Sequence, residues 1–353
     1  MTLERTLQLI DRKKMDGALE SYAIIVGYGG EETRFLSDDV NMDSVFDIAS
    51  LGKVFPTTPL ALRAIGDGRL SLDDTLAKFF DGVPEDRAGV TVKNLLTHTS
   101  GMLRATYPDD IAKNGRESVL EFLFSRPLAY ETGTRYAYCC DGLLLLGFIL
   151  EKVYGAPLDE LFISEFCRPL GLTRSSYKIA MDEENAVMCL TRLVMGESRY
   201  DDYNVRRLGG IPAGNGGNYS TPHDIREYVL ALMRRDERLY SREMFDLAEQ
   251  NYTDGLPVLD EFRGTDHRGL GFVYVDGACY QACELFPEGS IGHEGYTGQS
   301  FFLNRELGLY VIILSNATRC TVKKYGKARY EEVCDLRAEL HREIGRDLGL
   351  IKE

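Results

Sequence analysis

A serine that is followed three residues later by a lysine can act as a nucleophile with a base of its own, and this spacing occurs twice in the chain. The two occurrences are residues 50–53 (SLGK) and residues 175–178 (SSYK). A serine hydroxyl is a poor nucleophile until a neighbouring base accepts its proton. Lysine can be that base when burial or a nearby cation lowers its pKa towards neutrality. The spacing alone is a weak signal, so the surrounding residues must distinguish the two sites.

The segments around the two serines predict different structures. Ser50 follows a strand-like segment, residues 46–49 (FDIA), and begins a stretch with helical spacing of apolar residues. Lys53 would then lie one turn along on the same face, and the N–H of Ser50 at a helix N-terminus, where negative charge is stabilised. Ser175 lies in a polar turn after Gly171. Ser50 is therefore the candidate nucleophile, and a plain helix N-cap is the alternative role that its local sequence leaves open.

Motifs typical of other enzyme classes are missing from the sequence. The GxSxG of α/β-hydrolases, the HExxH of zinc proteases, the GxGxxG of dinucleotide-binding folds and the P-loop do not occur. The glycine-rich residues 214–217 (GNGG) lack both a preceding strand and a following lysine, so we interpret them as a structural loop. There is also no suitably spaced set of cysteine and histidine ligands, so no metal site and no cofactor are predicted.

A histidine base for the serine is not evident from the sequence. The chain has five histidines, which are His98, His223, His267, His293 and His341. His223 falls in the first turn of a predicted helix and His341 falls in a late helix, so neither has the position of a base. A lysine or a tyrosine whose pKa is shifted by its surroundings is the remaining candidate.

The composition is that of an acidic globular protein. The chain has 353 residues, enough for two domains or one large one, and 41 Lys and Arg against 55 Asp and Glu give a net charge of −14. This charge repels phosphate backbones and argues against a nucleic-acid partner. The longest apolar stretch, residues 143–150, is much shorter than the ~18 residues of a membrane span, so no membrane segment is predicted. The oligomeric state is left open.

The N-terminal segment and the cysteines suggest an intracellular chain. Residues 1–17 have no continuous apolar region of the kind found in signal peptides, and Leu3, Leu7 and Ile10 fall on one face of an amphipathic helix. The eight cysteines include no CxxC pair and are too few for a disulfide framework in a chain of this length. We therefore expect buried free thiols and a cytoplasmic location.

Strands and a helix are predicted at both ends of the chain. After the first helix, residues 21–38 predict a β-hairpin with glycines at its turn. In the last third, short apolar segments separated by turns predict an antiparallel sheet, and a helix from about residue 323 to residue 348 closes the chain. The strands predicted there are residues 269–275, 278–285, 289–293, 300–303 and 309–314.

The middle of the chain is predicted to be mostly helical. One helix is expected from residue 50 to about residue 65, kinked where Pro56 and Pro59 each remove a backbone donor. Further stretches with helical spacing of apolar residues are residues 92–97, 118–124, 142–153 and 158–166.

Together these elements predict an α+β protein. The simplest packing brings residues 1–75 and 262–353 into one discontinuous α/β domain, because strands and a helix begin the chain and also end it. Residues 76–261 are then inserted as a mostly helical domain. The sequence has no internal repeat and no low-complexity linker to suggest another arrangement.

Several segments, in a fixed order, resemble a known enzyme family. They are residues 46–53 (FDIASLGK), 95–102 (LLTHTSGM), 133–151 (GTRYAYCCDGLLLLGFILE), 214–225 (GNGGNYSTPHDI) and 292–316 (GHEGYTGQSFFLNRELGLYVIILSN). Together they are similar to the serine β-lactamase and penicillin-binding-protein superfamily, on its class C β-lactamase, D-peptidase and esterase side. The resemblance covers most of the chain. It implies a class C β-lactamase-like fold, with an antiparallel sheet flanked by the N- and C-terminal helices.

The resemblance also implies roles for individual residues. Ser50 matches the nucleophile that is acylated in the family, and Lys53 matches its partner. Tyr138 matches the tyrosine of the family's Tyr-x-Asn motif, a general base with Lys53 beside it. The backbone N–H groups of Ser50 and Tyr296 would form the oxyanion hole. His98 matches a segment that we interpret as a structural turn anchor away from the chemistry.

The residues expected to bind substrate differ from the family pattern at His293 and Cys140. His293, Glu294 and Gly295 match the family's Lys-Thr-Gly or His-x-Gly segment, with His293 in place of the lysine of class C β-lactamases. Cys140 replaces an asparagine that hydrogen-bonds the acyl amide of β-lactams and peptides, and a thiol is a weak donor and a weak acceptor. We expect all of these residues to line the substrate site.

These residues predict a serine hydrolase that acts through an acyl-enzyme on Ser50. Tyr138, held near deprotonation by Lys53, is expected to take the serine proton, and water then cleaves the acyl-enzyme. A small or medium acyl ester is the expected substrate, because an ester lacks the N–H that the family's asparagine would bind. A D-amino-acid peptidase or β-lactamase acting on amides or β-lactams is one alternative. A non-catalytic binding module that keeps the pocket is the other.

Overall fold

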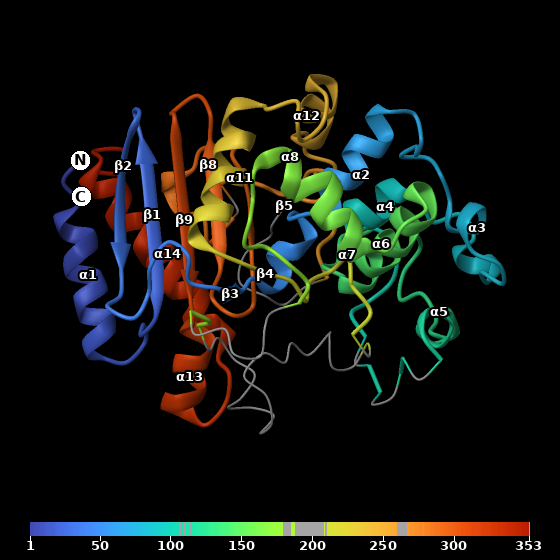
Figure 1. Cartoon of the computed structure of the whole chain (residues 1–353), viewed down its shortest axis with the longest axis horizontal. Helices are drawn as coiled ribbons and strands as arrows, with labels where there is room; N and C mark the ends of the chain where they lie inside the picture. The colour runs from blue at the N-terminus through green and yellow to red at the C-terminus, as the bar shows by residue number, and fades with distance from the viewer. Residues whose placement is uncertain are drawn as a thin grey trace.

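A computed structural model of the chain contains an antiparallel sheet with helices on both faces and, beside it, a mostly helical region (Figure 1). It describes residues 1–105, 107–108, 111–112, 114–178, 185–187, 208, 210–259, 267–277 and 279–352. The predicted division between residues 75 and 76 stays a prediction. The second predicted division, between residues 261 and 262, lies outside the described residues.

Strands from both ends of the chain form the main sheet. Its strands are β1 (Tyr22–Tyr28), β2 (Glu31–Leu36), β5 (His267–Arg268), β6 (Val273–Tyr274), β7 (Ile291–Glu294), β8 (Ser300–Asn304) and β9 (Leu309–Ser315). The order across this seven-stranded sheet is β2-β1-β9-β8-β7-β6-β5, and all neighbours are antiparallel. Because β1 pairs with β9, the N-terminal hairpin and the C-terminal strands share one sheet, as predicted.

Helices cover the sheet and build the region next to it. Those around the sheet are α1 (Glu4–Met15), α11 (Pro222–Arg234), α12 (Arg242–Ala248), the 3-10 turn η4 (Cys283–Leu285), α13 (Ala317–Tyr325) and α14 (Tyr330–Asp347). The others are η1 (Ala49–Lys53), α2 (Thr57–Gly66), α3 (Leu76–Phe79), η2 (Glu85–Arg87), α4 (Val92–Leu96), α5 (Arg116–Ser125), α6 (Cys140–Tyr154), α7 (Leu158–Leu161), the π-helical η3 (Phe162–Cys167) and α8 (Arg168–Leu170). A small second sheet pairs β3 (Phe46–Asp47) with β4 (Tyr219–Ser220).

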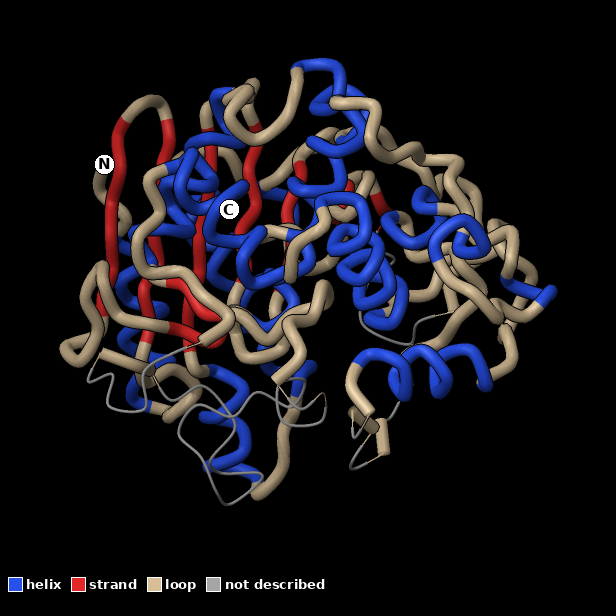
Figure 2. The backbone as a smooth tube through the Cα atoms, turned by 45° about the vertical axis from the view of Figure 1, so that its right-hand side comes forward, coloured by secondary structure: helices blue, strands red, loops and turns tan. Residues whose placement is uncertain are grey.

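The central strands β1, β8 and β9 are buried on both faces because helices pack against both sides of the sheet (Figure 2). In β1, Ile24 and Val26 belong to the cluster that includes buried residues of α1 and α14. Ala23 and Ile25 belong to the larger core that the sheet shares with α2, α6 and α11. Successive side chains of a strand point to opposite faces, so this division follows directly from the strand geometry.

The expected helix from residue 50 to about residue 65 is in fact two elements. The 3-10 turn η1 ends at Lys53, and α2 begins only at Thr57. Pro56 is the N-cap of α2, and the Phe55–Pro56 peptide is cis. A proline has no N–H to donate and its ring clashes with the preceding turn, which explains why a single helix does not form.

Two expectations about the last third are wrong. Residues 278–285 were expected as a strand, but the described part consists of turns and η4. Its buried residues Cys279, Ala282 and Leu285 are three apart, a spacing for one face of a helical turn rather than for a strand. The expected closing helix is broken at Gly326, whose φ of 72° is the left-handed conformation that ends α13.

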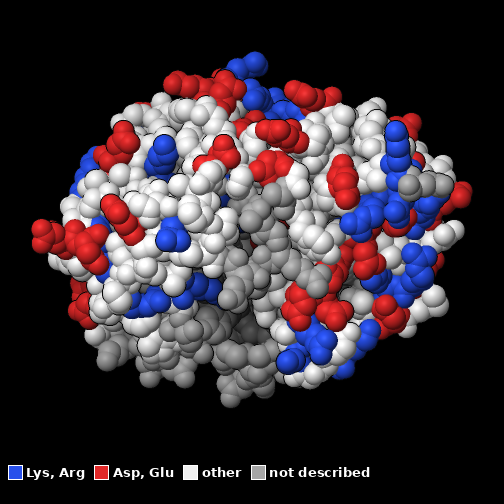
Figure 3. Space-filling model, turned by 180° about the vertical axis from the view of Figure 1, so that it is seen from behind, with Lys and Arg blue, Asp and Glu red and all other residues white. Residues whose placement is uncertain are grey.

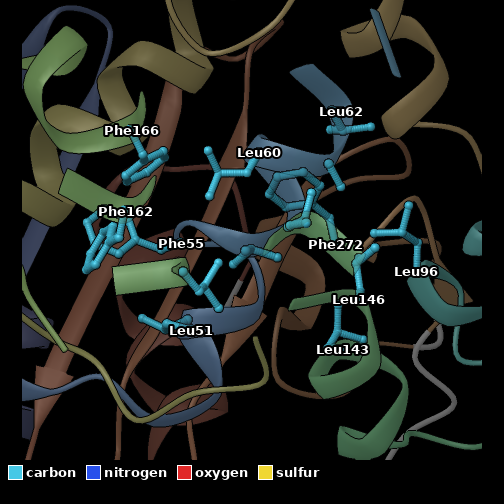
Figure 4. Packing of buried hydrophobic residues seen from close by; sticks show 14 of the residues in the cluster. Leu51, Phe55, Leu60, Leu62, Leu96, Leu143, Leu146, Phe162, Phe166 and Phe272 are labelled. Carbon is cyan, nitrogen blue, oxygen red and sulfur yellow. The ribbon is translucent and has the colours of Figure 1, made fainter. Parts of the chain in front are cut away.

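The segment after Ser50 is anchored in the hydrophobic core. Leu51 and Phe55 are fully buried, and Figure 4 shows them beside the aromatic residues of η3. The ring centroid of Phe55 lies 4.8 Å from that of Phe166 and 5.7 Å from that of Phe162, in edge-to-face geometry. Packing of Leu51 within η1 and of Phe55 just after it fixes this short turn.

The surface carries charges of both signs. Acidic and basic side chains are interspersed over the face that Figure 3 shows. Some of them join elements, as where Arg305 Nη2 lies 2.6 Å from Glu249 Oε1. In the part of the chain that the structure describes, no helix is long and apolar enough to cross a membrane, and no cluster of three or more His, Cys, Asp or Glu could hold a metal ion.

Candidate active site

Ser50 and Lys53 lie within a single 3-10 turn, η1. Side chains three residues apart are eclipsed in a 3-10 helix, so the two side chains are aligned. Lys53 Nζ lies 3.0 Å from Ser50 Oγ and also donates to the carbonyl of Asn215 at 2.8 Å. Lys53 is 0% exposed, whereas Ser50 is partly exposed. The predicted pairing of these residues is thus present, in a tighter turn than the α-helix that was expected.

The backbone just before Ser50 is in an unusual conformation. Ala49 has a φ of 46°, in the left-handed region that costs a residue with a Cβ about 1–2 kcal/mol. Its N–H donates to Asp47 Oδ1 at 2.8 Å, which helps to hold this conformation. Strained backbone of this kind clusters at functional sites, where the surrounding structure fixes it.

The glycine-rich loop packs directly onto η1. A Cβ on Gly52 would lie 2.3 Å from Asn218 Oδ1 and 2.9 Å from the Cα of Gly216, so no larger residue fits between Ser50 and Lys53 at this position. The loop was interpreted as structural only, but its Asn215 carbonyl binds the Lys53 ammonium group. This contact could not be predicted from the sequence, because it is made by a backbone carbonyl, which every residue type has.

Tyr138 approaches Ser50 from the segment before α6. Its side chain interacts with that of Ser50, and Lys53 Nζ lies 5.0 Å from the centroid of its ring. Burial raises the pKa of Tyr138 well above its ordinary value, although its interaction with Ser50 acts in the opposite direction. Burial lowers the pKa of Lys53. These directions favour a protonated tyrosine beside a lysine that loses its proton more easily, and they oppose the expectation that Tyr138 is held near deprotonation.

Cys140 faces the same group of side chains. It is the first residue of α6, is partly exposed, and interacts electrostatically with Lys53. The thiol therefore lies near Lys53, and its contact with a substrate stays a prediction.

His293 lies close to Tyr138 but is a buried, uncharged side chain. The two ring centroids are 6.2 Å apart, and His293 is 1% exposed. Its Nδ1 donates to the carbonyl of Glu294 at 2.9 Å, while Nε2 has no partner among the described residues. Burial lowers the pKa of His293 well below its ordinary value, and the nearby Arg268 and Lys53 lower it further. The imidazole is therefore neutral and does not replace the charge of a lysine.

The turn after β7 lies against the segment that leads into Ser50. A Cβ on Gly295 would lie 2.8 Å from the carbonyl oxygen of Ile48, so glycine permits this close approach. Thr297 Oγ1 and Gln299 Nε2 donate to the carbonyl of Asp47 at 3.0 Å and 2.6 Å. The turn from residue 295 to residue 299, which carries Tyr296, is thus joined to the nucleophile segment.

His98 and Arg268 form the surroundings of Tyr138. The ring centroid of His98 lies 4.8 Å from that of Tyr138, so the expectation that His98 lies away from the chemistry is wrong. Its Nδ1 lies 3.1 Å from both the N and the O of Cys139. Arg268, a residue that the sequence analysis did not single out, has its Cζ 5.4 Å from the Tyr138 ring centroid and donates from Nε to Tyr136 OH at 3.0 Å.

The second Ser-x-x-Lys pattern is not a comparable site. Ser175 is buried, and its Oγ donates to Asp224 Oδ2 at 2.8 Å. Lys178 is exposed and pairs with Asp159 at 3.1 Å instead of contacting Ser175. The sequence context had correctly separated this pattern from residues 50–53.

Comparisons with known proteins identify the family of the chain. A model of the Beta-lactamase family matches residues 7–332. The chain belongs to the beta-lactamase family. It is a serine hydrolase of that family, as the motif series predicts.

Relatives that are named for different activities match most of this beta-lactamase-family chain. A putative D-alanyl-D-alanine carboxypeptidase of Escherichia coli (strain K12) is 30% identical over 310 residues, which cover 77% of this chain and 69% of that protein. Esterase EstB of Burkholderia gladioli is 27% identical over 360 residues, 88% of each chain. A class C beta-lactamase in complex with cefoxitin has a TM-score of 0.74 at 18% identity, covering 96% of this chain and 97% of the other. The predicted class C β-lactamase-like fold is confirmed.

Proposed function

We propose that this hydrolase is an esterase, which cleaves esters of small or medium acyl groups through an acyl-enzyme on Ser50. The observation that carries the proposal is the 3.0 Å contact between Lys53 Nζ and Ser50 Oγ, made by a lysine that is completely buried. A desolvated amine at hydrogen-bond distance from a hydroxyl is the arrangement that activates a serine.

Lys53 is the first proton acceptor in the proposed mechanism. Burial lowers its pKa, which increases the fraction of neutral amine at a given pH. Ser50 Oγ attacks the ester carbonyl carbon and its proton passes to Lys53. Tyr138, whose side chain interacts with Ser50, passes a proton to the leaving alcohol and regains one from Lys53. Water then attacks the acyl-enzyme carbonyl, and the same groups return the proton to Ser50.

The developing oxyanion is assigned to two backbone N–H groups, those of Ser50 and Tyr296. The join between residues 295–299 and Asp47 supports this assignment, because it brings the two backbone segments together. Preorganised N–H donors of this kind stabilise the transition state more than the substrate.

Cys140 and His293 favour an ester over an amide. The thiol of Cys140 is a poor partner for an amide group, and the neutral His293 supplies no cation for a substrate carboxylate. Esters also need less protonation of the leaving group than amides do. These features support hydrolysis of simple, uncharged esters.

A D-amino-acid peptidase or β-lactamase is the second candidate. It is supported by the His-x-Gly segment of His293, Glu294 and Gly295, and by 30% identity to a protein named putative D-alanyl-D-alanine carboxypeptidase. A non-catalytic binding module is less well supported, because the contact between Ser50 and Lys53 is intact.

Intact-mass analysis after exposure to two reagents separates these functions. The protein is mixed with p-nitrophenyl butyrate or with benzylpenicillin, quenched in acid, and weighed. A butyryl adduct that is absent in Ser50→Ala supports the esterase. A penicilloyl adduct that forms faster than the butyryl adduct supports the second candidate. An absence of both adducts and of turnover refutes a catalytic function for Ser50.

A further inference from the structure

An arginine of the last long helix is buried behind the turn between β7 and β8. Arg337 of α14 is 1% exposed. Its Nη1 donates to Gln281 Oε1 at 2.7 Å and to Tyr330 OH at 3.2 Å. Its Nη2 donates to the backbone carbonyls of Gly295 and, at 2.9 Å, Gln299. None of these four acceptors is a carboxylate. Burial opposes the charge of Arg337, but the nearby Tyr330, Cys334 and Glu294 raise the pKa of its guanidinium, so Arg337 stays charged.

The two carbonyls that bind Arg337 are the ends of one short turn, residues 295–299. The N–H of Gly295 donates to the carbonyl of Gln299 at 2.6 Å, which closes the turn. The opposite side of the turn is bound to the carbonyl of Asp47 by Thr297 and Gln299. The turn is therefore held between α14 on one side and the segment before η1 on the other.

One of these carbonyls shares a peptide unit with the N–H of Tyr296. The C=O of Gly295 and the N–H of Tyr296 are joined by a planar amide whose electrons are delocalised. A hydrogen bond from a charged guanidinium to that oxygen draws electron density from the amide nitrogen, and its N–H becomes a stronger donor. The effect is larger in a buried site, where the effective dielectric constant is low.

We propose that Arg337 is a positioning residue for the oxyanion hole. It fixes residues 295–299 through two carbonyl bonds and polarises the peptide between Gly295 and Tyr296. The Tyr296 N–H then binds the full negative charge of the tetrahedral intermediate better than it binds the substrate carbonyl. This inference rests on the proposed acyl-enzyme function, but it concerns transition-state stabilisation and not the identity of the nucleophile.

Arg337→Gln tests the proposal because it removes the charge while keeping a polar side chain. We expect kcat for p-nitrophenyl butyrate to fall about 10- to 100-fold, less than the ~10²- to 10³-fold loss when a whole oxyanion donor is deleted. KM should change less than about threefold, since the effect belongs to the transition state. The inhibition constant of an alkylboronic acid, which forms a tetrahedral adduct on serine, should rise in proportion to the loss of kcat. Arg337→Lys keeps the charge and should retain more kcat than Arg337→Gln.

Arg87 provides a matched control. It is 3% exposed and donates to the carbonyl of Leu123 at 3.0 Å, in the helical region. Arg87→Gln should lower the melting temperature and leave kcat unchanged. Should Arg337→Gln fail to fold, Gln281→Leu carries the test, because it removes one Nη1 acceptor and leaves the Nη2 contacts in place. That variant should lose kcat by a smaller factor.

The inference and the proposed function fail in different ways. Wild-type kcat in folded Arg337→Gln, or in Gln281→Leu if only that variant folds, overturns the role of Arg337. So does an equal loss of kcat in Arg87→Gln, or a loss confined to KM. In each of these cases normal acylation of Ser50 would leave the esterase proposal standing. Turnover by Ser50→Ala would instead refute the proposed function itself.

Discussion

Lys53 Nζ lies 3.0 Å from Ser50 Oγ, and Lys53 is 0% exposed to solvent. The lysine is thus removed from water, and its ammonium group contacts the Ser50 hydroxyl and the Asn215 carbonyl. None of these partners carries a carboxylate that would hold the ammonium form strongly. The burial of Lys53 and its contact with Ser50 therefore favour a role for Lys53 as a base and not as a fixed positive charge.

Replacing the nucleophile should abolish turnover while the fold survives. Ser50 is partly exposed, so Ser50→Ala removes a hydroxyl without creating a large cavity. We expect no ester hydrolysis and no acyl adduct, with a melting temperature close to that of the wild type. Ser175→Ala is the matched control, because Ser175 belongs to the other Ser-x-x-Lys pattern, and it should keep full kcat. Acylation at Ser175, or wild-type turnover by Ser50→Ala, would contradict the assignment.

Lys53 and Tyr138 should behave as one proton-transfer unit. Lys53→Ala and Tyr138→Phe should each lower kcat/KM by several orders of magnitude, because both side chains contact Ser50. The double variant should be little worse than either single variant, since groups that act together are strongly non-additive. A double-mutant cycle measured with one ester checks this. Losses that simply multiply would mean that the two residues act in independent steps.

The pH dependence should follow Lys53 on the acidic side. The amine must be neutral to accept the Ser50 proton, so kcat/KM should rise with pH through the pKa of Lys53. Burial lowers that pKa, which places the rise below the ordinary lysine value of about 10.4. Tyr138 must keep its proton, and burial raises its pKa, so no decline is expected below about pH 10. A rate that falls between neutral pH and pH 9 would argue against a neutral lysine base.

The sequence predicts those features of the fold and of the site that depend on the types of the side chains. Burial of β1 and β9 on both faces follows from their continuous apolar residues, and the pairing of Ser50 with Lys53 follows from the motif series. The Asn215 contact could not be predicted, because every residue has a carbonyl. Arg268 and Arg337 could not be predicted either, because arginine is usually exposed and only tertiary packing buries these two.

His293 should modulate the reaction without carrying it. It is neutral, and its Nε2 has no partner among the described residues, so it can accept a hydrogen bond but does not supply charge. His293→Gln keeps a hydrogen-bonding group and should lower kcat/KM by about tenfold or less, the value of roughly one hydrogen bond. Kinetics on a neutral ester and on an ester with a carboxylate should show the same loss for both. A loss as deep as that of Ser50→Ala would identify His293 as a base.

Among the residues expected at the site, Cys140 departs most from the family's motif. Its thiol interacts with Lys53, and the family resemblance implies that it replaces an asparagine that binds a substrate amide. A site built to hydrogen-bond an amide discriminates strongly for it, whereas a site with a thiol does not. The wild type should therefore hydrolyse simple esters and react poorly with penicillins. Cys140→Asn should shift the ratio of penicillin to ester acylation by about tenfold, which equals ~1.4 kcal/mol or roughly one net hydrogen bond.

The test of Cys140 compares acylation rates with benzylpenicillin and p-nitrophenyl butyrate in the wild type and in Cys140→Asn. Cys140→Ser is the control, because it keeps the size of the side chain without an amide, and its ratio should stay near that of the wild type. Alkylation by iodoacetamide gives an independent readout, since Cys140 is partly exposed and a bulky group beside Lys53 would block the approach of substrate to Ser50. An unchanged ratio in Cys140→Asn, together with full activity after alkylation of this thiol, would mean that Cys140 only fills space and that other residues select the substrate.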